Sequence, residues 1–487
     1  MTKEEKKETF NISKEKDFSN WYTEIVKRAE LADIESGVKG FLVFQPWSVL
    51  SMEKMFQHME SVLQRKAHKP YFYPTLIPEK NFHIEANHVK GFTPQVFWVT
   101  HAGKNKLEER YALRPTSETV FYKMFSKWIE SYNQLPFKTY QRANVFRYET
   151  KATRPFLRSR EFHWIETHCA HKDESAALAQ VHEDMETTQE VLHDIFGIPF
   201  IFFERPDWDK FPGAQRTFAA DALNPDGRVI QQPSTHIINE NFSKGFKVNY
   251  TDKNEKEQLA RLTCYGPAIS RIFASVVITH GDDKGLKFPW KIAPLQVIIV
   301  PIAADKDKNV ILTAKKLKAQ LQENNITVDI DADLTKRPGE KFFYWEMKGV
   351  PLRIELGPKE IKEKKLTLYR RDTDKKETIS EKDLIKYIEK TSKAIDTNLI
   401  KKADEVFKGR IQNAKSKEEI QKLINDGKIA RINFCSCKMD GAKCAEVVEK
   451  DIGAEVRGTQ LKKEKPTGNC IFCKKKAKEV VYIAKSY

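Results

Sequence analysis

Two long segments of the chain repeat apolar side chains at helical spacing. Between residues 47 and 66 the apolar side chains form one stripe, and between residues 308 and 323 they are interspersed with lysines. Both patterns predict amphipathic helices that bury one face. The stripes consist of Met52, Met55, Phe56, Met59 and Leu63 in the first segment and of Val310, Leu312, Ala314, Leu317 and Leu321 in the second.

Runs of aromatic and β-branched residues predict strands on both sides of a turn-rich boundary at residues 288–294. The run that follows this boundary is continuously apolar, which is typical of a strand covered on both faces. Beyond it, strands and helices alternate, and this indicates a compact α/β domain over about residues 296–390. The expected strands lie at 71–73, 199–203, 295–300, 326–330, 352–356 and 366–369.

Composition excludes several classes of protein. The 487 residues are 40% hydrophobic and 11% aromatic, which is enough for a sizeable core and excludes wholesale disorder. No apolar run approaches the roughly 18 residues of a membrane helix, and the first 20 residues contain no apolar segment of a secretory signal. We therefore expect a cytoplasmic protein with no membrane partner.

Positive charge is concentrated near the end of the chain. The formal net charge is +16, and residues 401–487 hold 21 lysines and arginines against 12 acidic residues, a net of +9. This excess is compatible with a solvated basic surface and also with a surface that meets phosphate groups.

The seven cysteines are too few and too unevenly placed for a disulfide scaffold. Cys169 and Cys264 are isolated, whereas the other five all follow residue 434. Residues 470–473 form a Cys-x2-Cys pair, which is a common half of a structural zinc site. The C-terminal cluster therefore indicates metal ligands in a reducing compartment. The alternative is that the thiols are reduced and bind no metal.

Four segments of the first 290 residues matter jointly: the helix predicted at 47–66 with its flanks, and three segments that carry candidate chemistry. On a strand, Thr116 and Glu118 would share one face and could hold a protonated amine. Arg147 and Glu149 could likewise share a strand face. Arg147 could bind a phosphate or carboxylate by two hydrogen bonds, and Glu149 could accept a hydrogen bond from an exocyclic amine. Arg271 opens the predicted helix at 272–279, where oriented N–H groups favour a phosphate. Taken singly, each has a structural alternative: a core helix at 47–66, a chance Thr-x-Glu, or an ion-paired hairpin.

In this order and spacing, the segments resemble the three signature motifs of class II aminoacyl-tRNA synthetases. The closer resemblance is to prolyl-tRNA synthetases of the archaeal/eukaryotic type, and it covers nearly the whole chain. Residues 348–358 resemble the anticodon-binding domain of the family. The other specific segments are 88–92, 114–118, 155–162, 241–244 and 280–286.

The resemblance implies an α+β and α/β multidomain architecture. We expect a class II catalytic domain on an antiparallel sheet at 1–290, an α/β anticodon-binding domain at 291–395 and a small zinc-binding-like α/β domain at 396–487. The implied activity joins proline to ATP as prolyl-adenylate and transfers the prolyl group to the 3′ end of tRNA(Pro). The family is homodimeric through its first motif, which would explain the apolar stripe at 47–66.

The family's functional positions can be carried over to this sequence. Arg147 and Arg271 would be catalytic, and the cofactors would be ATP as substrate, Mg²⁺ and a structural Zn²⁺. The proline site would consist of Thr116, Glu118, Arg147, His236, Phe92, Trp164 and Phe211. The ATP site would consist of Arg147, Glu149, Arg158, Ser159, Phe162, Gln231, Ser234 and Arg271.

Outside the catalytic domain, the resemblance implies that Glu346 and Arg353 read anticodon bases, with an ion pair inside the domain as the alternative. The zinc ligands would be Cys435, Cys444, Cys470 and Cys473, although Cys437 competes with Cys435. In relatives the tail that ends here at Tyr487 reaches toward the catalytic domain.

Two positions depart from the family pattern. Ser270 precedes Arg271 where the family usually has Glu, and Pro233 interrupts the strand expected to carry Gln231 and Ser234. The stretch at 167–260 leaves little room for a large editing insertion, so we expect no hydrolysis of mischarged alanine by this chain.

Two alternatives remain at this point. A threonyl or glycyl enzyme of the same class is disfavoured by the pocket residues Phe92, Trp164 and His236. An RNA-binding scaffold without chemistry is disfavoured by four residues suited to ATP: Arg147, Glu149, Arg158 and Arg271.

Overall fold

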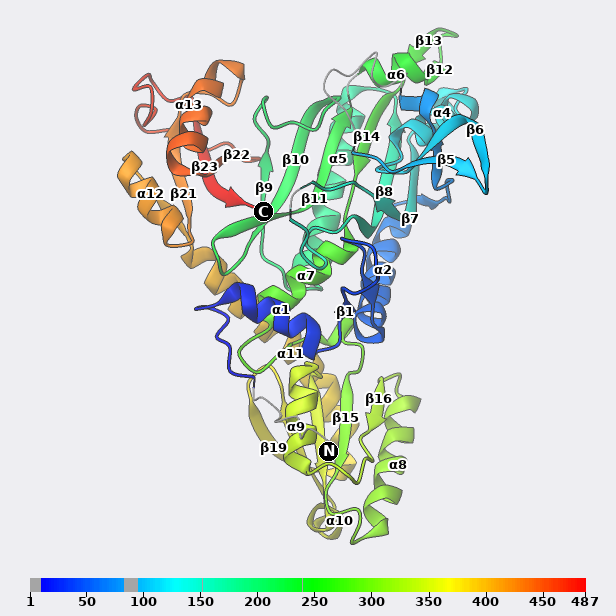
Figure 1. Ribbon diagram of the computed structural model, residues 1–487, viewed down its shortest axis with the longest axis vertical. Helices are drawn as coiled ribbons and strands as arrows, with labels where there is room; N and C mark the ends of the chain where they lie inside the picture. The colour runs from blue at the N-terminus through cyan, green and yellow to red at the C-terminus, as the bar shows by residue number, and fades with distance from the viewer. Residues whose placement is uncertain (1–9, 83–94, 151, 239) are drawn as a thin grey trace.

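The computed structural model describes residues 10–82, 95–150, 152–238 and 240–487, and its largest feature is a sheet of 11 strands (Figure 1). The order of the strands is β20-β21-β23-β22-β9-β10-β11-β14-β8-β7-β3, and most neighbours are antiparallel. From the N-terminal part come β3 (Lys69–Pro70), β7 (Phe137–Phe146), β8 (Glu161–His171), β9 (Ile201–Glu204), β10 (Ala214–Leu223), β11 (Arg228–Ile238) and β14 (Arg261–Tyr265). From the C-terminal part come β20 (Ile411–Asn413), β21 (Ile429–Phe434), β22 (Glu455–Gln460) and β23 (Glu479–Ser486).

Helices back the N-terminal half of this sheet. The bounds are α1 (Phe18–Arg28), α2 (Pro46–Arg65), α4 (Glu118–Trp128), α5 (Glu174–Thr188), α6 (Glu240–Phe246) and α7 (Ile269–His280). The small strands nearby are β1 (Ala32–Asp33), β2 (Val43–Phe44), β4 (Leu76–Pro78), β5 (Trp98–Ala102), β6 (Asn105–Leu113), β12 (Asn249–Thr251) and β13 (Glu257–Leu259).

The helix α2 confirms the prediction for residues 47–66, but its apolar stripe does not face a partner. Met55 and Met59 are fully buried in one cluster with Trp21 of α1 and Phe273 of α7. The stripe therefore belongs to the core of this chain, where it shares one cluster with α1 and α7.

A second sheet of five strands forms the middle of the chain, in the order β16-β15-β17-β18-β19 (Figure 1). This unit confirms the expected α/β domain, and α8 begins and ends at the predicted residues. Leu312 lies outside the buried stripe and is 63% exposed, because only positions 310, 314, 317 and 321 share the inner face. The bounds are β15 (Val297–Pro301), α8 (Lys308–Glu323), β16 (Val328–Ile330), α9 (Pro338–Met347), β17 (Leu352–Leu356), α10 (Pro358–Glu363), β18 (Lys365–Arg370) and β19 (Lys375–Ser380).

The helix α11 (Leu384–Gly409) runs through the predicted boundary at 395/396 and leads from the middle unit to the C-terminal unit. The C-terminal unit adds α12 (Lys417–Asn425) and α13 (Ala442–Val447). Its strand β22 pairs with β9, so its sheet continues the central sheet instead of standing apart. In the part of the chain that the structure describes, we find no helix that is both long and apolar enough to cross a membrane.

The predicted strand at 71–73 is wrong. Only Lys69–Pro70 pairs with β7, and the chain then leaves the sheet between Pro70 and Pro74, which cannot donate backbone hydrogen bonds. Phe72 is 88% exposed as a result.

The middle unit is fastened to the N-terminal unit by the loop that follows α7. Arg371 donates to both carboxylate oxygens of Asp282, and Leu286 N donates to Met347 O at 3.0 Å. Gly285 has a φ of +135°, and a Cβ added there would lie 2.4 Å from Met347 Cα. The contact therefore requires glycine at this position.

We expect Gly285→Ala to lower the free energy of unfolding by about 1–3 kcal/mol, because the methyl group overpacks a backbone contact. Thermal unfolding and limited proteolysis between the two units would measure the change. Gly339→Ala is the control, because a Cβ at Gly339 meets no atom within 4 Å. Equal melting temperatures for the two variants would contradict this account of the contact.

Candidate active site

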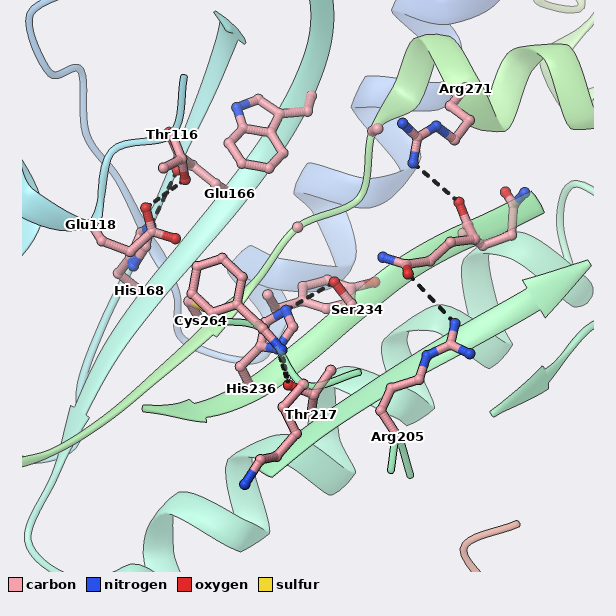
Figure 2. Close-up of a pocket in the computed structure, with 18 of the residues that line it drawn as sticks. Thr116, Glu118, Glu166, His168, Arg205, Thr217, Ser234, His236, Cys264 and Arg271 are labelled. Carbon is pink, nitrogen blue, oxygen red and sulfur yellow. Dashed lines mark hydrogen bonds and ion pairs between the residues drawn. The ribbon is translucent and has the colours of Figure 1, made fainter. Parts of the chain in front are cut away.

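A cavity of about 310 Å³ opens on the face of the central sheet that the helix α5 does not cover (Figure 2). Side chains of β8, β11 and β14 alternate between this cavity and the opposite face. Thus Ser234 and His236 of β11 line the cavity, while Thr235 points to α5. The predicted residues that line it are Thr116, Glu118, Arg147, Phe162, Trp164, Phe211, Gln231, Ser234, His236 and Arg271.

Thr116 and Glu118 lie together on one wall, but not on a strand. The strand β6 ends at Leu113, and Glu118 is the first residue of α4. The Thr116 hydroxyl donates to Glu118 Oε2 at 2.5 Å. Burial raises the pKa of Glu118, although the nearby His168 opposes the shift. An ammonium group in the cavity would find both oxygens on this wall.

Glu166 and His168 lie beneath this pair, and the site predicted from the sequence does not include them. Glu166 accepts from Ser117 Oγ at 2.5 Å and from Gln141 Nε2 at 2.6 Å, and its other oxygen lies 3.2 Å from His168 Nε2. Burial alone would raise the pKa of Glu166, but these hydrogen bonds and His168 lower it. The even-numbered positions of β8 (162, 164, 166 and 168) share the cavity face, and this alternation could have identified both residues.

Arg147 lies just beyond the end of β7, so the expectation that it shares a strand face with Glu149 is wrong. Its Nε donates to Pro115 O at 3.0 Å, and its guanidinium lies 5.2 Å from the ring centre of Phe162. Burial lowers its pKa, and the neighbouring Glu118 opposes this. Among the described residues, Glu149 lies outside the lining of the cavity.

Arg271 enters from the first turn of α7 on the opposite wall. Its Nη1 donates to the backbone oxygen of Gln231 at 3.4 Å. Burial, reinforced by Arg147, lowers its pKa to about 10, so it remains charged at neutral pH. Ser270 beside it accepts from His163 N at 3.3 Å and thereby holds the start of α7 on β8.

His236 is held in its neutral form. Its two ring nitrogens lie 3.0 Å from Thr217 Oγ1 and 2.9 Å from Ser234 Oγ. Burial, with a contribution from Arg205, lowers its pKa to about 3. The imidazole can therefore exchange hydrogen bonds without adding charge to the cavity.

Pro233 fits a central strand because β11 bulges there. Ser234 pairs with Ala219 and Gln231 with Asp221, so two residues of β11 stand opposite one residue of β10. A bulge leaves the missing N–H of proline outside the ladder. The side chains of Gln231 and Ser234 consequently both reach the cavity.

The remaining predicted ATP residues face adjoining spaces. Arg158 lines a cavity of about 240 Å³ together with Arg271, Gln231 and Tyr487. Ser159 lines another, of about 570 Å³, near Arg154. Phe92, like the rest of the segment 88–92, lies outside the described residues.

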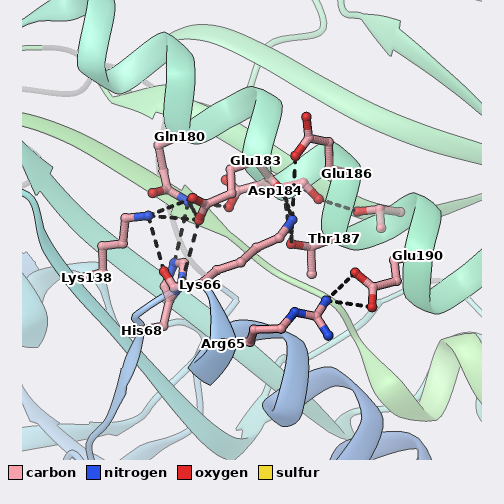
Figure 3. Close-up of polar contacts among 11 residues, drawn as sticks. Arg65, Lys66, His68, Lys138, Gln180, Glu183, Asp184, Glu186, Thr187 and Glu190 are labelled. Carbon is pink, nitrogen blue, oxygen red and sulfur yellow. Dashed lines mark hydrogen bonds and ion pairs between the residues drawn. The ribbon is translucent and has the colours of Figure 1, made fainter.

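The helix α5 lies behind the cavity, and Figure 3 shows the polar contacts of this helix, including that between Gln180 and Asp184. Thr235 donates to Asp184 Oδ2 at 2.6 Å, and Gln180 Nε2 donates to the other oxygen at 2.9 Å. One helical turn later, Thr188 shares a hydrogen bond with Tyr265 of β14 at 2.9 Å. Burial raises the pKa of Asp184 to about 7 despite these donors.

The C-terminal cysteines form a cluster. The Sγ atoms of Cys435, Cys444, Cys470 and Cys473 all lie within 4.8 Å of one another. Cys437 lies outside this group, and its backbone N donates to Glu479 at 2.5 Å. The geometry therefore favours Cys435 over Cys437.

In the middle unit, Arg353 is engaged inside the protein. Its Nη1 donates to Glu346 Oε1 at 2.9 Å, and its Nη2 donates to Glu355 Oε1 at 3.0 Å. The side chain is only 4% exposed and is stacked on Phe342 and Tyr369. The ion pair named as the structural alternative is thus present.

Comparison with known proteins agrees with this geometry. Family models match the tRNA synthetase class II core domain (G, H, P, S and T) at residues 97–280, an anticodon binding domain at 296–391 and a prolyl-tRNA synthetase C-terminal domain at 417–487. The proline–tRNA ligase of Thermofilum pendens is 44% identical over 98% of both chains. The chain belongs to the prolyl-tRNA synthetase family.

Other members support this membership over the whole length. The proline–tRNA ligase of Methanopyrus kandleri is 39% identical, over 97% of this chain and 96% of that one. The structure of Giardia lamblia prolyl-tRNA synthetase with prolyl-adenylate has a TM-score of 0.93 at 35% identity, over 98% of this chain and all of that one. That of Cryptosporidium parvum prolyl-tRNA synthetase with halofuginone and AMPPNP has a TM-score of 0.92 at 29% identity, with the same coverage. The expected class II fold is therefore confirmed.

The buried Asp184 leads to a pH prediction. Its folded pKa, about 7, is above the ordinary value of 3.8, so its proton stabilises the folded chain at low pH. This stability is lost as the pH rises from about 4 to about 7, whereas the neighbouring His68, whose pKa burial lowers from 6.5 to about 4, contributes the opposite change over much of the same range.

Comparison with Asp184→Asn isolates this effect: relative to the variant, the unaltered protein should lose melting temperature as the pH rises from about 4 to about 7, and the difference should stay constant above that. Glu186→Gln is the control, because Glu186 lies on the same helix with its side chain 75% exposed. If Asp184→Asn kept the slope of the unaltered protein, this explanation would be wrong.

Proposed function

We propose that this chain works as a proline–tRNA ligase, which activates proline with ATP to prolyl-adenylate and then charges tRNA(Pro). The supporting observation is one cavity with an amine-binding pair, Thr116 and Glu118, on one wall and the guanidinium groups of Arg147 and Arg271 on the others. A zwitterionic imino acid and a polyphosphate are the reactants that such charges would bind side by side.

The first step requires no protein nucleophile. The carboxylate of proline attacks the α-phosphorus, a bond forms between that oxygen and phosphorus, and pyrophosphate leaves with the electron pair of the broken bond. In this proposal Arg147 neutralises the carboxylate and α-phosphate, and Arg271 holds the γ-phosphate. Positioning and charge neutralisation then supply most of the catalysis.

The other site residues would orient the two substrates. Trp164, Phe211, Phe92 and His236 would enclose the proline ring. Phe162 would stack on adenine, and Glu149 would accept from its amino group. Arg158 and Ser159 would bind the triphosphate, and Gln231 and Ser234 would contact ATP or the Mg²⁺ that accompanies it.

The tRNA would be selected by the middle unit. An arginine can pair with guanine and a glutamate can accept from an amino group, which suits Arg353 and Glu346 to the guanines of a proline anticodon. Because these side chains bind each other in the free protein, reading a base would require them to exchange partners.

A homodimer is part of the same proposal, with tRNA charging in the cytoplasm. Apolar side chains stand exposed around β2 and the start of α2, and a partner surface would cover them. They are Ile34, Val38, Val43, Val49 and Leu50.

Zinc fits the cysteine cluster, because four thiolates in one shell make a closed tetrahedral site of the structural kind. The proposed ligands are Cys435, Cys444, Cys470 and Cys473. Zinc there would cross-link two loops of the C-terminal unit and would take no part in activation.

Exchange of pyrophosphate into ATP tests the activity. We expect exchange with proline, and much less with threonine, glycine, cysteine or alanine. Arg271→Ala should reduce the exchange rate by about 100-fold or more, because it removes charge stabilisation from the transition state.

Arg353→Ala is the companion variant. It should leave exchange unchanged and reduce only the charging of tRNA(Pro). Equal damage to both reactions would contradict the role given to the middle unit, exchange with threonine alone would point to a threonyl enzyme, and no exchange with any amino acid would favour the scaffold.

Metal analysis tests the cluster. Purified protein should contain about one zinc per chain, and Cys444→Ser should lose it and melt at a lower temperature. Cys437→Ser should keep the metal, since Cys437 lies outside the cluster. Loss of zinc from Cys437→Ser alone would contradict the proposed ligand set.

A further inference from the structure

A buried group of three charges joins the C-terminal unit to the catalytic sheet. Asp221 of β10 is completely buried and accepts two hydrogen bonds from each of two arginines. Arg205 donates at 2.7 and 3.1 Å, and Arg457 of β22 donates at 2.8 and 3.2 Å. We infer that Arg457 is a positioning residue of the nucleotide site, so that the C-terminal unit builds part of the ATP-binding surface; this rests on the proposed function.

Contacts lead from Arg457 directly to the cavity wall. The backbone oxygen of Arg457 accepts from Arg205 Nη1 at 2.9 Å. The other terminal nitrogen of Arg205 lies 3.5 Å from Gln231 Oε1, and the backbone oxygen of Gln231 accepts from Arg271 (Figure 2). Gln231 is therefore held between the arginine that Arg457 orients and the arginine proposed to meet the γ-phosphate.

Arg457 also lines the second cavity, of about 240 Å³, where it stands with Arg158, Gln231 and Arg271. Two of these residues, Gln231 and Arg271, line the larger cavity as well. The space beside Arg457 thus continues the site in which the phosphates would lie. Its lining brings together three guanidinium groups, an arrangement suited to a polyphosphate or to departing pyrophosphate.

The side chain of Arg457 acts from a distance, because its donors are already engaged. Nε and Nη2 bind Asp221, and Nη1 donates to Glu455 at 2.5 Å. Two buried arginines share one buried carboxylate, and Glu455 and Asp209, both about half exposed, lie beside them. Because these five groups carry no net positive charge, Arg457 acts on the site by fixing Asp221 and, through it, Arg205.

The backbone is shaped for this contact. Gly458, next to Arg457, has a φ of +122°, and a Cβ there would lie 2.1 Å from Glu204 O. Glycine thus lets β22 lie against β9, where Thr459 pairs with Glu204. Since Arg205 directly follows Glu204 in the chain, the pairing of these strands brings the two arginines to the same carboxylate.

Kinetics of the full-length protein test this inference. Arg457→Gln should raise the KM for ATP and for pyrophosphate in the exchange reaction by about tenfold, and leave the KM for proline within about twofold. Arg457→Lys keeps the charge but cannot bracket Asp221, and should give a smaller rise. Titration with AMPPNP, which measures binding without turnover, should show the highest affinity for the unaltered protein, a lower one for Arg457→Lys and the lowest for Arg457→Gln.

The matched control is Arg431→Gln. Arg431 lies on β21 of the same unit and donates to Glu464 by two nitrogens, and its strand pairs with β20 and β23. It should leave all three KM values and AMPPNP affinity unchanged.

Three outcomes separate the possibilities. A KM for ATP in Arg457→Gln equal to that in Arg431→Gln would overturn the inference, with Arg457→Lys deciding if the glutamine variant does not fold. The inference would also be overturned if the KM for proline, the KM for ATP and the melting temperature all changed in parallel. The group of Arg205, Asp221 and Arg457 would then serve only to attach the C-terminal unit. If the variants differ in AMPPNP affinity as expected but the unaltered protein shows no proline-dependent exchange, the proposed function is overturned instead.

Discussion

Positive charge held away from water is the constraint on which this structure depends. Arg147, Arg205 and Arg271 reach one cavity, and a guanidinium group is costly to bury without a compensating carboxylate. Three buried acids meet this requirement: Glu118 beside Arg147, Glu166 beneath the amine-binding wall and Asp221 beneath Arg205. Because the surroundings are poorly polarisable, each guanidinium group acts strongly on an anion that enters beside it. The hydrogen bonds that keep the acids ionised are therefore as important for the site as the arginines themselves.

The continuous central sheet places the buried acids and the arginines close to one another. Neighbouring strands place alternate side chains on one face, so acids, arginines and aromatic rings converge without a long loop. On the other face, α5 grips β11 through Asp184 and β14 through Thr188. The C-terminal strands extend the same sheet, and the Tyr487 hydroxyl accepts a hydrogen bond from Arg154 of the N-terminal unit. The arrangement agrees with the tail position implied by the family resemblance.

Periodicity in the sequence identified the elements well when their neighbours were local, and the helix at 308–323 has the predicted bounds. The ten predicted residues that line one cavity were identified as a set by the family resemblance. Errors arose where the chain leaves a regular element: Thr116 follows Pro115 out of a strand, and Arg147 lies one residue past β7. The triad of Arg205, Asp221 and Arg457 escaped notice because 236 residues separate two of its members, and no local pattern reports such a pairing. The core-helix alternative for residues 47–66 is confirmed, but no local pattern shows that Phe273 of α7 joins the cluster around its stripe.

The order of the C-terminal strands affects how the chain folds while it is being synthesised. The last strand, β23, lies between β21 and β22 and also touches β11. While residues 479–486 are still inside the ribosome, two strand edges of the nascent chain lack their central neighbour and are open to pairing with other chains. Premature termination before residue 479 would leave both edges exposed permanently, which makes such fragments prone to aggregation.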